Sequence, residues 1–375
     1  MKTKQTMIYK TLNRALSVKR PHNTTGSAQF TEWLHTNLPR RNHIAVTYDA
    51  AGNLHVDARL DPTHRTLFVA HVDTVHHTIG ANKIRKTTAV WYADGSQLGA
   101  DDGVGCALLM HMLHAGVPGY YVFTQGEERG GIGAKHLAEA CAPLLTEFDR
   151  AIAFDRKGTD SIITHQGYGR CCSDEFGDAL ATALNATDNE LMYSPDDTGV
   201  YTDTAEFTGI IPECTNVSCG YMYEHSDREQ LDMIHFDLLA KAVLAVKWDA
   251  LPTRRDPTIP DPDDVVVFNS WANYKDSIKT CPTNDSFGTW PAYDTSDLTE
   301  DEYLYECLLD AQQGFLTGVI TLMAQSVYPE EPEMAVKFID RKKLTDDAIT
   351  MAMGMCGHND VDSILCTLFD MAYAE

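Results

Sequence analysis

The sequence predicts an α/β fold in which a mixed, mainly parallel central sheet lies between helices, with a small helical region at the C-terminal end. Two observations support this prediction. Apolar runs of strand length alternate with segments of helical spacing over the first two thirds of the chain, and three runs end in acidic residues or histidine. A length of 375 residues indicates one large domain or two unequal ones, and 43% hydrophobic residues suffice for a sizeable core.

The elements come in chain order as a helix, a hairpin, and then alternating strands and helices. The first helix is predicted because Trp33, Leu34 and Leu38 fall on one side of it. The hairpin has β-branched strands on either side of a Gly52-Asn53 turn. The later strands are short apolar runs, a pattern typical of buried central strands. Helices are predicted at 30–38, 103–115 and 133–141, and strands at 44–48, 54–56, 66–70, 120–124, 151–154 and 217–221.

Acidic residues and a histidine directly follow three of these strands. They are His71 and Asp73 after the first, Glu127 and Glu128 after the second, and Asp155 after the third. In an open α/β sheet, ligands bind outside the carboxyl ends of the strands, so we expect these side chains to gather on one rim. Four carboxylates around one histidine repel one another strongly unless a cation is present. The cluster therefore predicts a metal site.

Charge and composition exclude several classes of partner. The formal charge of −24 disfavours nucleic acid and anionic membranes, which bind cationic surfaces. No run approaches the roughly 18 apolar residues of a membrane span, and the lysines of residues 1–10 precede no apolar segment, so a cytoplasmic location is expected. The ten cysteines are scattered, and none forms a CxxC pair. We expect free thiols rather than disulfides or a cysteine zinc site.

Five motifs in chain order resemble those of the two-zinc exopeptidases of the M28, M20 and M42 clan. They are Ala70-His71-Val72-Asp73, Gly99-Ala100-Asp101-Asp102-Gly103-Val104-Gly105, Gly126-Glu127-Glu128, Phe154-Asp155 and Glu224-His225-Ser226. The glycine at 103, where M20 members commonly have lysine, is closer to M28 aminopeptidases. The segment 201–207, followed by Ile211-Pro212, is also M28-like. The resemblance covers about residues 30–251 and implies a zinc-exopeptidase fold of the phosphorylase/hydrolase-like type.

The resemblance implies a ligand set for two metal ions. Asp101 would bridge the ions, with His71 and Asp155 completing one site and Glu128 and His225 completing the other. Each ion would keep an open position, as a catalytic site requires. Imidazole and carboxylate ligands without sulfur suit two zinc ions, with cobalt or manganese as substitutes.

The same resemblance implies roles for further acids. Glu127 is the expected general base, which takes a proton from a shared water and delivers it to the leaving amine. Asp73, also expected in the catalytic machinery, would accept the N–H of His71 and fix its tautomer. Asp102 and Asp203 are expected either in similar supporting roles or as plain surface acids.

Three other histidines are candidates for the same site. His76 and His77 follow the first motif closely, but a solvated loop is the favoured interpretation. Related enzymes sometimes place an oxyanion-contacting histidine where His165 lies, although no motif surrounds it here.

Four residues of the later motifs are open to two interpretations. Tyr221 and Tyr223 either line the site or pack as ordinary aromatic residues. Arg156 and Lys157 either steer a substrate carboxylate or are solvated, and solvation is favoured.

The spacing of the motifs sets the domain organisation. Only 70 positions separate Asp155 from His225, too few for the lid domain that M20 enzymes insert there, so residues 1–251 form a catalytic domain without a lid. Prolines mark 252–298 as a linker or extended arm. Residues 299–375 are expected to be helical and acidic, and they could cover the site, contact another copy or dock a partner.

The sequence is interpreted as that of a cytoplasmic two-zinc aminopeptidase or dipeptidase acting on small peptides. On the same scaffold, a deacylase of acylated amino acids or a carboxypeptidase is the alternative. From a different class, a non-catalytic metal-binding scaffold is the second alternative, and the complete ligand set argues against it. No nucleic-acid or membrane partner is expected, and an oligomer formed through the C-terminal helices is left open.

Overall fold

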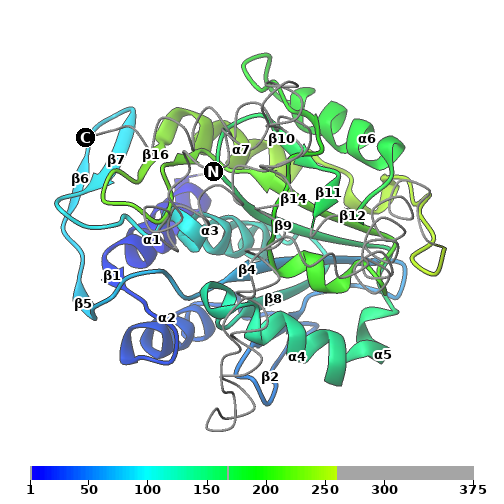
Figure 1. The fold of residues 1–375 in the computed structure, drawn as a ribbon, viewed down its shortest axis with the longest axis horizontal. Coiled ribbons are helices and arrows are strands. Elements are labelled where there is room, and N and C mark those ends of the chain that lie inside the picture. The colour runs from blue at the N-terminus through cyan, green and yellow to red at the C-terminus, as the bar shows by residue number, and fades with distance from the viewer. Residues whose placement is uncertain (1, 167–168, 260–375) are drawn as a thin grey trace, which may run out of the picture. The chain divides into compact units, whose positions relative to one another are not determined.

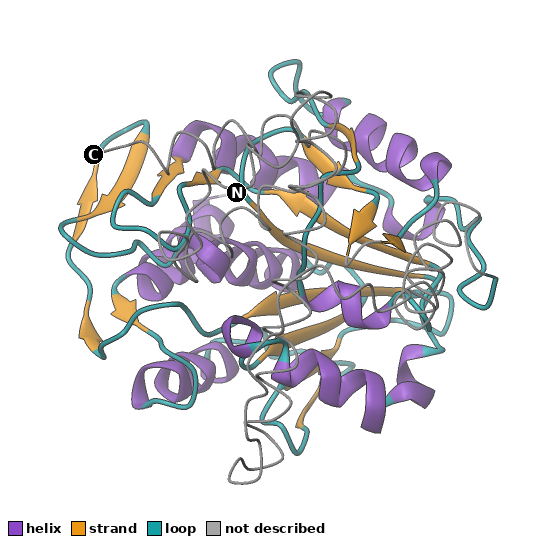
Figure 2. Ribbon diagram, in the orientation of Figure 1, coloured by secondary structure: helices purple, strands orange, loops and turns teal. Residues whose placement is uncertain are grey.

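The computed structural model describes residues 2–166 and 169–259, in which an eight-stranded mixed sheet lies between helices (Figures 1 and 2). The predicted fold class is confirmed. Parallel pairing joins β4 to both β8 and β9, and β9 to β14, whereas β2, β3 and β8 pair in antiparallel fashion. In spatial order the strands are β13 (Ser194–Asp196), β10 (Ser161–Ile163), β14 (Glu213–Ser218), β9 (Arg150–Arg156), β4 (Thr66–His71), β8 (Tyr120–Thr124), β3 (Leu54–Asp57) and β2 (Ala45–Tyr48).

The central strand β4 contributes to two hydrophobic cores. Its side chains alternate, with Phe68 and Ala70 in one core and Leu67 and Val69 in the other. A strand points successive side chains to opposite faces, so an apolar run without alternation must be buried on both. All six residues of β4 are buried, which agrees with the prediction for this run.

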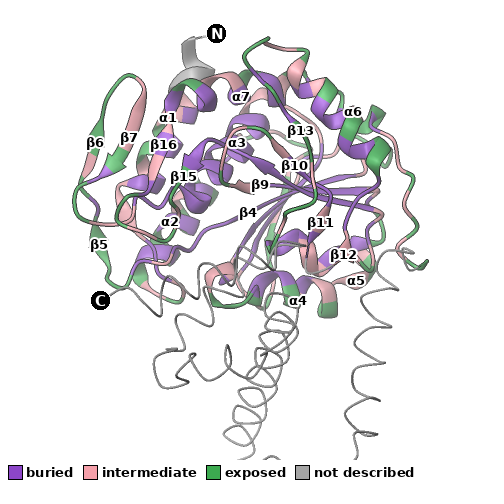
Figure 3. Cartoon of the chain, turned by 45° about the horizontal axis from the view of Figure 1, so that its top comes forward, coloured by how far each residue is buried: buried purple, intermediate pink, exposed green. Residues whose placement is uncertain are grey.

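Helices cover both faces of the sheet, and buried residues concentrate in the strands and on the inward faces of these helices (Figure 3). One core includes residues of α1 (Lys2–Leu16), α2 (Thr25–Thr36), α3 (Ala100–Ala115), α6 (Asp174–Asn185) and α7 (Met233–Ala245). The other includes residues of α4 (Ile132–Ala140), α5 (Ala142–Leu145) and the 3₁₀ helix η2 (Asp203–Phe207). Two further 3₁₀ helices are η1 (Glu127–Arg129) and η3 (Trp248–Ala250).

Smaller sheets surround this framework. A four-stranded sheet has the order β15 (Tyr221–Met222), β16 (Gln230–Asp232), β7 (Val90–Ala93) and β6 (Ile84–Lys86). Two-stranded sheets pair β1 (Val18–Lys19) with β5 (Gly80–Ala81) and β11 (His165–Gln166) with β12 (Gly169–Arg170). The loop between β15 and β16 carries His225.

The predicted strand at 217–221 is wrong in its bounds. β14 ends at Ser218, and the chain turns at Gly220, whose φ of 96° is in the left-handed region that favours glycine. Tyr221 then begins β15 in the four-stranded sheet. The chain therefore changes sheets within what appeared as one apolar run.

The predicted linker at 252–298 begins within the described residues. The backbone N–H groups of Arg254 and Arg255 donate to Glu213 Oε1 at 2.6 and 3.1 Å, so the chain is held against the sheet up to this point. The rest of the linker and the predicted helical region at 299–375 lie outside the described residues. Within the described ranges, no helix is both long and apolar enough to cross a membrane, and six cysteines are free thiols.

Candidate metal centre

The five predicted metal ligands lie together at the carboxyl edge of the main sheet. Because β4, β8 and β9 run parallel as neighbours, the residues at their carboxyl ends meet at this edge. The N-terminus of α3 and the β15–β16 loop supply the remaining two side chains. The five are His71 at the end of β4, Glu128 in η1 after β8, Asp155 in β9, Asp101 in α3 and His225 in the loop.

Asp101 stands between the two histidines. Its Oδ1 lies 2.9 Å from His71 Nε2, and its Oδ2 lies 3.1 Å from His225 Nε2. Asp155 Oδ1 is 3.5 Å from His71 Nε2, and Glu128 Oε2 is 3.2 Å from His225 Nε2. The centre thus divides into two halves that share Asp101, each with one histidine and one further carboxylate.

Charges in the centre compensate one another. Hydrogen bonds with Asp101 and then Glu128 raise the pKa of His225 to about 11. Burial disfavours the charged form of His71, but the carboxylates of Asp155 and Asp101 still raise its pKa well above the ordinary value. Burial also opposes ionisation of Asp101, yet hydrogen bonds from both histidines lower its pKa. Without a cation, protons on the imidazoles therefore balance the carboxylates.

The donor atoms fit divalent cations. Ligand atoms of Asp101, Glu128 and His225 lie within 4.8 Å of one another, and those of His71, Asp102 and Asp155 form a second such group. Glu128 Oε1 is buried without a hydrogen-bond partner in the described structure. A buried, unpaired carboxylate oxygen is costly, and coordination of a cation would remove that cost. Imidazole and carboxylate donors are a set that zinc takes.

Glu127 lies beside the ligands rather than between them. Its Oε2 is 4.0 Å from His71 Nε2, and its side chain is 12% exposed. Burial, together with the charges of Asp155 and Asp203, raises the pKa of Glu127 to about 10. The carboxyl group thus faces the centre at a distance where it can exchange a proton with a molecule bound there.

Asp73 holds the turn that carries the two glutamates. Its Oδ1 accepts the backbone N–H groups of Gly126 and Glu127 at 2.8 and 3.3 Å, and its Oδ2 accepts that of Glu128 at 3.3 Å. The expected hydrogen bond from His71 is absent from the described structure, because Asp73 Oδ1 lies 3.7 Å from His71 Nδ1. Asp73 therefore positions the turn and faces the imidazole only at ion-pair distance.

Asp102 and Asp203 are buried, so the surface-acid alternative is wrong for both. Asp102 accepts the backbone N–H of His71 at 3.1 Å and that of Gly105 at 2.8 Å. Asp203 is hydrogen-bonded to the hydroxyl of Thr124, and burial raises its pKa to about 7. Both acids support the centre through neighbouring atoms.

Glu229 is a supporting residue that the sequence did not single out. It is 1% exposed, and it accepts the backbone N–H groups of Gly99, Ala100 and Asp101 at 2.9, 2.7 and 3.1 Å. The buried guanidinium of Arg20 donates to the carbonyl of Gly99 at 3.3 Å. Burial raises the pKa of Glu229 to about 7, and the charge of Asp101 adds to this effect. No motif surrounds Glu229, and only its place four residues after His225 could have pointed to it.

Asp155 has supporting partners of its own. Thr202 Oγ1 donates to its Oδ2 at 2.7 Å, and Tyr221 Oη donates to its Oδ1 at 3.1 Å. Asn216 Oδ1 accepts its backbone N–H at 2.8 Å. Tyr221 thus contacts a predicted ligand, whereas the sequence favoured simple packing. Thr202 lies in the 201–207 segment that carried the resemblance, and this was the available signal.

The other candidate histidines do not join the centre. His76 is buried rather than solvated, because its Nδ1 is paired with Thr74 Oγ1 at 2.7 Å and its Nε2 with the carbonyl of Gln97 at 2.9 Å. The expectation of a solvated loop is therefore wrong for His76, while His77 is exposed. His165 lies in β11 and belongs to neither ligand group.

The rim of the centre holds paired cations. Lys157 Nζ lies 2.7 Å from Glu224 Oε1, and Arg156 donates to Thr198 Oγ1 at 3.0 Å. The exposed ring of Tyr223 is covered by the guanidinium of Arg228 at 5.3 Å. These interactions give Lys157, Arg156 and Arg228 partners of their own.

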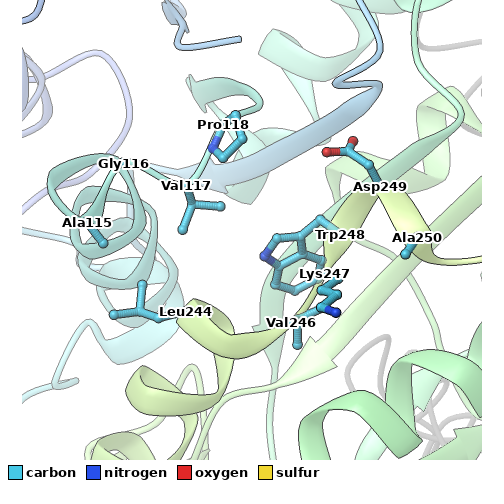
Figure 4. Close-up of a pocket in the computed structure, with 10 residues that line it drawn as sticks. All are labelled: Ala115, Gly116, Val117, Pro118, Leu244, Val246, Lys247, Trp248, Asp249 and Ala250. Carbon is cyan, nitrogen blue, oxygen red and sulfur yellow. The ribbon is translucent and has the colours of Figure 1, made fainter. Parts of the chain in front are cut away.

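A separate pocket of about 680 Å³ lies away from this centre (Figure 4). Its lining includes Ala115 and Gly116 at the C-terminal end of α3, together with Leu244 and Trp248. Asp101 is at the N-terminal end of the same helix. Because α3 has 16 residues and rises about 1.5 Å per residue, the pocket and the metal ligands are roughly 20 Å apart along this helix.

Comparisons with known proteins agree with the geometry. A family model described as "Peptidase family M28" matches residues 53–247, more than half of the chain. Aminopeptidase PepT from Bacillus cereus is similar in structure, with a TM-score of 0.53, 14% identity, and coverage of 66% of this chain and 98% of PepT. The Pyrococcus horikoshii TET1 peptidase has a TM-score of 0.50 at 15% identity, covering 64% of this chain and 98% of that one.

The LapA aminopeptidase of Legionella pneumophila has a TM-score of 0.50 at 17% identity, covering 67% of this chain and 72% of LapA. At these identities the likeness shows a shared fold. No curated protein sequence matches the chain significantly.

Proposed function

The chain belongs to peptidase family M28 and is a metallopeptidase, and on this premise we propose that it is a two-zinc aminopeptidase of small peptides. The observation that supports this proposal best is the position of Asp101, whose two carboxylate oxygens each face a different histidine. A carboxylate in that position is suited to bridge two cations. The two halves around Asp101 each offer one imidazole and one further carboxylate.

The proposed ligands of one ion are His71, Asp101 and Asp155, and those of the other are Asp101, Glu128 and His225. Zinc bound there would supply a water of lowered pKa and would polarise the scissile carbonyl, with cobalt or manganese as substitutes. Glu128 Oε1, which is buried and unpaired, would gain a partner. Asp73, Asp102 and Glu229 would keep the ligand backbones in place, as their hydrogen bonds to N–H groups indicate.

Glu127 is proposed as the general base. Bound cations would lower the pKa of its carboxyl group, and the carboxylate would then take a proton from the attacking water and return it to the nitrogen of the leaving amine. Burial keeps the side chain of Glu127 within the centre, and Asp73 holds the turn beneath it.

The paired cations on the rim favour aminopeptidase over carboxypeptidase activity. A carboxypeptidase needs a cation for the C-terminal carboxylate of its substrate, and Lys157 and Arg156 already have partners. A deacylase remains the second candidate, because the same centre could hydrolyse an acylated amine. The location in the cytoplasm and the assembly into oligomers stay predictions.

The substitution Glu127→Gln tests the proposed role. We expect both zinc ions of the catalytic centre to remain bound while kcat falls by about 10²–10⁴-fold, the usual contribution of a general base. Glu139→Gln, on the exposed side of α4, is the matched control and should keep full activity. Normal turnover in Glu127→Gln would contradict the assignment.

A panel of dipeptides separates the two candidate reactions. Cleavage of free dipeptides with no cleavage of their N-acetylated forms supports the aminopeptidase. Release of acetate from N-acetyl amino acids, without cleavage of free dipeptides, would show a deacylase instead.

A further inference from the structure

A second cluster of metal-ligand side chains lies outside the catalytic centre, between the β2–β3 turn and α4. Asp49 belongs to the turn, His136 lies in α4, and Cys141 caps the C-terminal end of that helix. The carboxylate, imidazole and thiol atoms of these residues all lie within 4.8 Å of one another. All three residues are partly buried, so the cluster is neither free surface nor sealed core.

The separation of the donor atoms is close to what one ion requires. Zinc binds sulfur at about 2.3 Å and imidazole nitrogen or carboxylate oxygen at about 2.0–2.2 Å. In tetrahedral coordination two such donors are therefore about 3.3–3.6 Å apart. The donor atoms lie within 4.8 Å of one another, and rotation of the His136 and Cys141 side chains would bring them to the separation that one ion requires.

The carboxylate of the cluster is fixed and charged before any ion arrives. Asp49 Oδ1 accepts the backbone N–H groups of Ala51 and Asn53, each at 2.9 Å. Its Oδ2 accepts from Asn53 Nδ2 at 2.6 Å and is paired with His55 Nε2 at 3.1 Å. His55 is held in turn by Tyr120 Oη, 3.1 Å from Nδ1. These four contacts fill the lone pairs of the carboxylate, so a cation would displace one of them, and the rest would hold the ligating carboxylate as outer hydrogen bonds commonly do.

The thiol of Cys141 lies close to the negative charge of Asp49. Burial, and then the charge of Asp49, raise the pKa of Cys141, so the sulfur carries its proton at neutral pH. A cation placed between the two groups would remove the repulsion, and the thiol proton would pass to solvent as the metal–sulfur bond forms.

We propose that Asp49, His136 and Cys141 bind one zinc-class divalent cation, with water in the fourth position. One thiolate, one imidazole and one carboxylate form a donor set that zinc takes. The ion would clip α4 to the β2–β3 turn. Because α4 begins three residues after η1, the clip would stiffen the helix that follows Glu127 and Glu128.

Cobalt binding distinguishes this site from the catalytic centre, whose proposed ligands include no sulfur. We expect the full-length protein saturated with Co²⁺ to show a thiolate-to-cobalt charge-transfer band. Cys141→Ser should abolish the band, and His136→Ala and Asp49→Asn should each weaken it at least tenfold at limiting metal. His43 is exposed, precedes β2 in the chain and lies outside the cluster. The control variant His43→Ala should therefore keep the band.

Zinc content gives an independent readout. Wild-type protein should hold one zinc ion more per chain than Cys141→Ser. No band in the wild type, or a band unaffected by Cys141→Ser, would overturn the proposal. A band lost in Cys141→Ser but kept in both His136→Ala and Asp49→Asn would show a lone reactive thiol and would also overturn it. None of these outcomes depends on the proposed catalytic reaction.

Discussion

Glutamine at position 229 would replace one carboxylate oxygen of the buried Glu229 with an NH₂ group. The carboxylate accepts three backbone N–H groups at the start of α3, two at Oε1 and one at Oε2. In either orientation of the amide, at least one of these N–H groups would face another donor. The peptide that carries Asp101 is among the three, so the substitution acts on the proposed bridging ligand without touching it.

The expected cost follows from these bonds. One buried N–H left without an acceptor costs about 1–3 kcal/mol. The remaining bonds lose their charge, and charge-assisted bonds are roughly twice as strong as neutral ones. We therefore expect Glu229→Gln to lower the free energy of unfolding by about 2–4 kcal/mol. Zinc affinity should fall by about 10–100-fold, as for other residues that hold metal ligands in place.

The measurement is best made at about pH 8, above the pKa of about 7 that burial gives Glu229, where the wild-type carboxylate is charged. Chemical denaturation gives the change in stability, and competition with a zinc chelator gives the change in affinity. Glu190→Gln, at an exposed position, is the matched control. At saturating zinc, kcat should recover towards the wild-type value, because Glu229 positions a ligand and does not contact the substrate. Wild-type zinc affinity in Glu229→Gln would refute the reasoning.

Two further predictions concern protons and packing. Zinc affinity should rise with pH through the neutral range, because His225 has a pKa of about 11 without metal and must lose its proton to bind zinc. Calorimetry in buffers of different ionisation enthalpy counts the protons released on zinc binding. Zinc binding without proton release would contradict this prediction. Gly133→Ala should lower the free energy of unfolding, measured by denaturant titration, by about 1–3 kcal/mol, because its Cβ would lie 2.7 and 2.8 Å from the backbone N and O of Gln125. The control Gly209→Ala, whose Cβ would have no atom within 4 Å, should change this free energy by less than about 0.5 kcal/mol.

The parts of the site that the sequence could predict are those placed by local structure. His71 and Asp155 end apolar strands, and neighbouring parallel strands bring their ends together whatever the details of the packing. His225 ends no strand of the main sheet, so only the family motif could identify it. Glu229 was missed, and Tyr221 could not be told from a packing residue, because their partners lie far away in sequence and hydrogen bonds between distant segments leave no periodic signal.

Among the helices, too, some could be predicted from the local sequence pattern and others could not. α3 was predicted from the spacing of its apolar residues, although it begins three residues earlier than expected. α7 has seven buried residues among its 13 and packs against α3, α6 and strands of the smaller sheet. A helix with apolar residues around much of its circumference lacks the single apolar stripe that identifies a surface helix. Its position was therefore missed.

The buried acids link four of the five ligand segments into a chain of supports. In each case a carboxylate close in sequence to one proposed ligand accepts a hydrogen bond from the backbone N–H of a different ligand. The pairs are Asp102 with His71, Asp73 with Glu128, and Glu229 with Asp101. Loosening one segment therefore withdraws the support of the next. The two halves of the centre should form and melt as a single cooperative unit, and transplanting one motif into another scaffold would carry over a ligand without the neighbour that holds it in place.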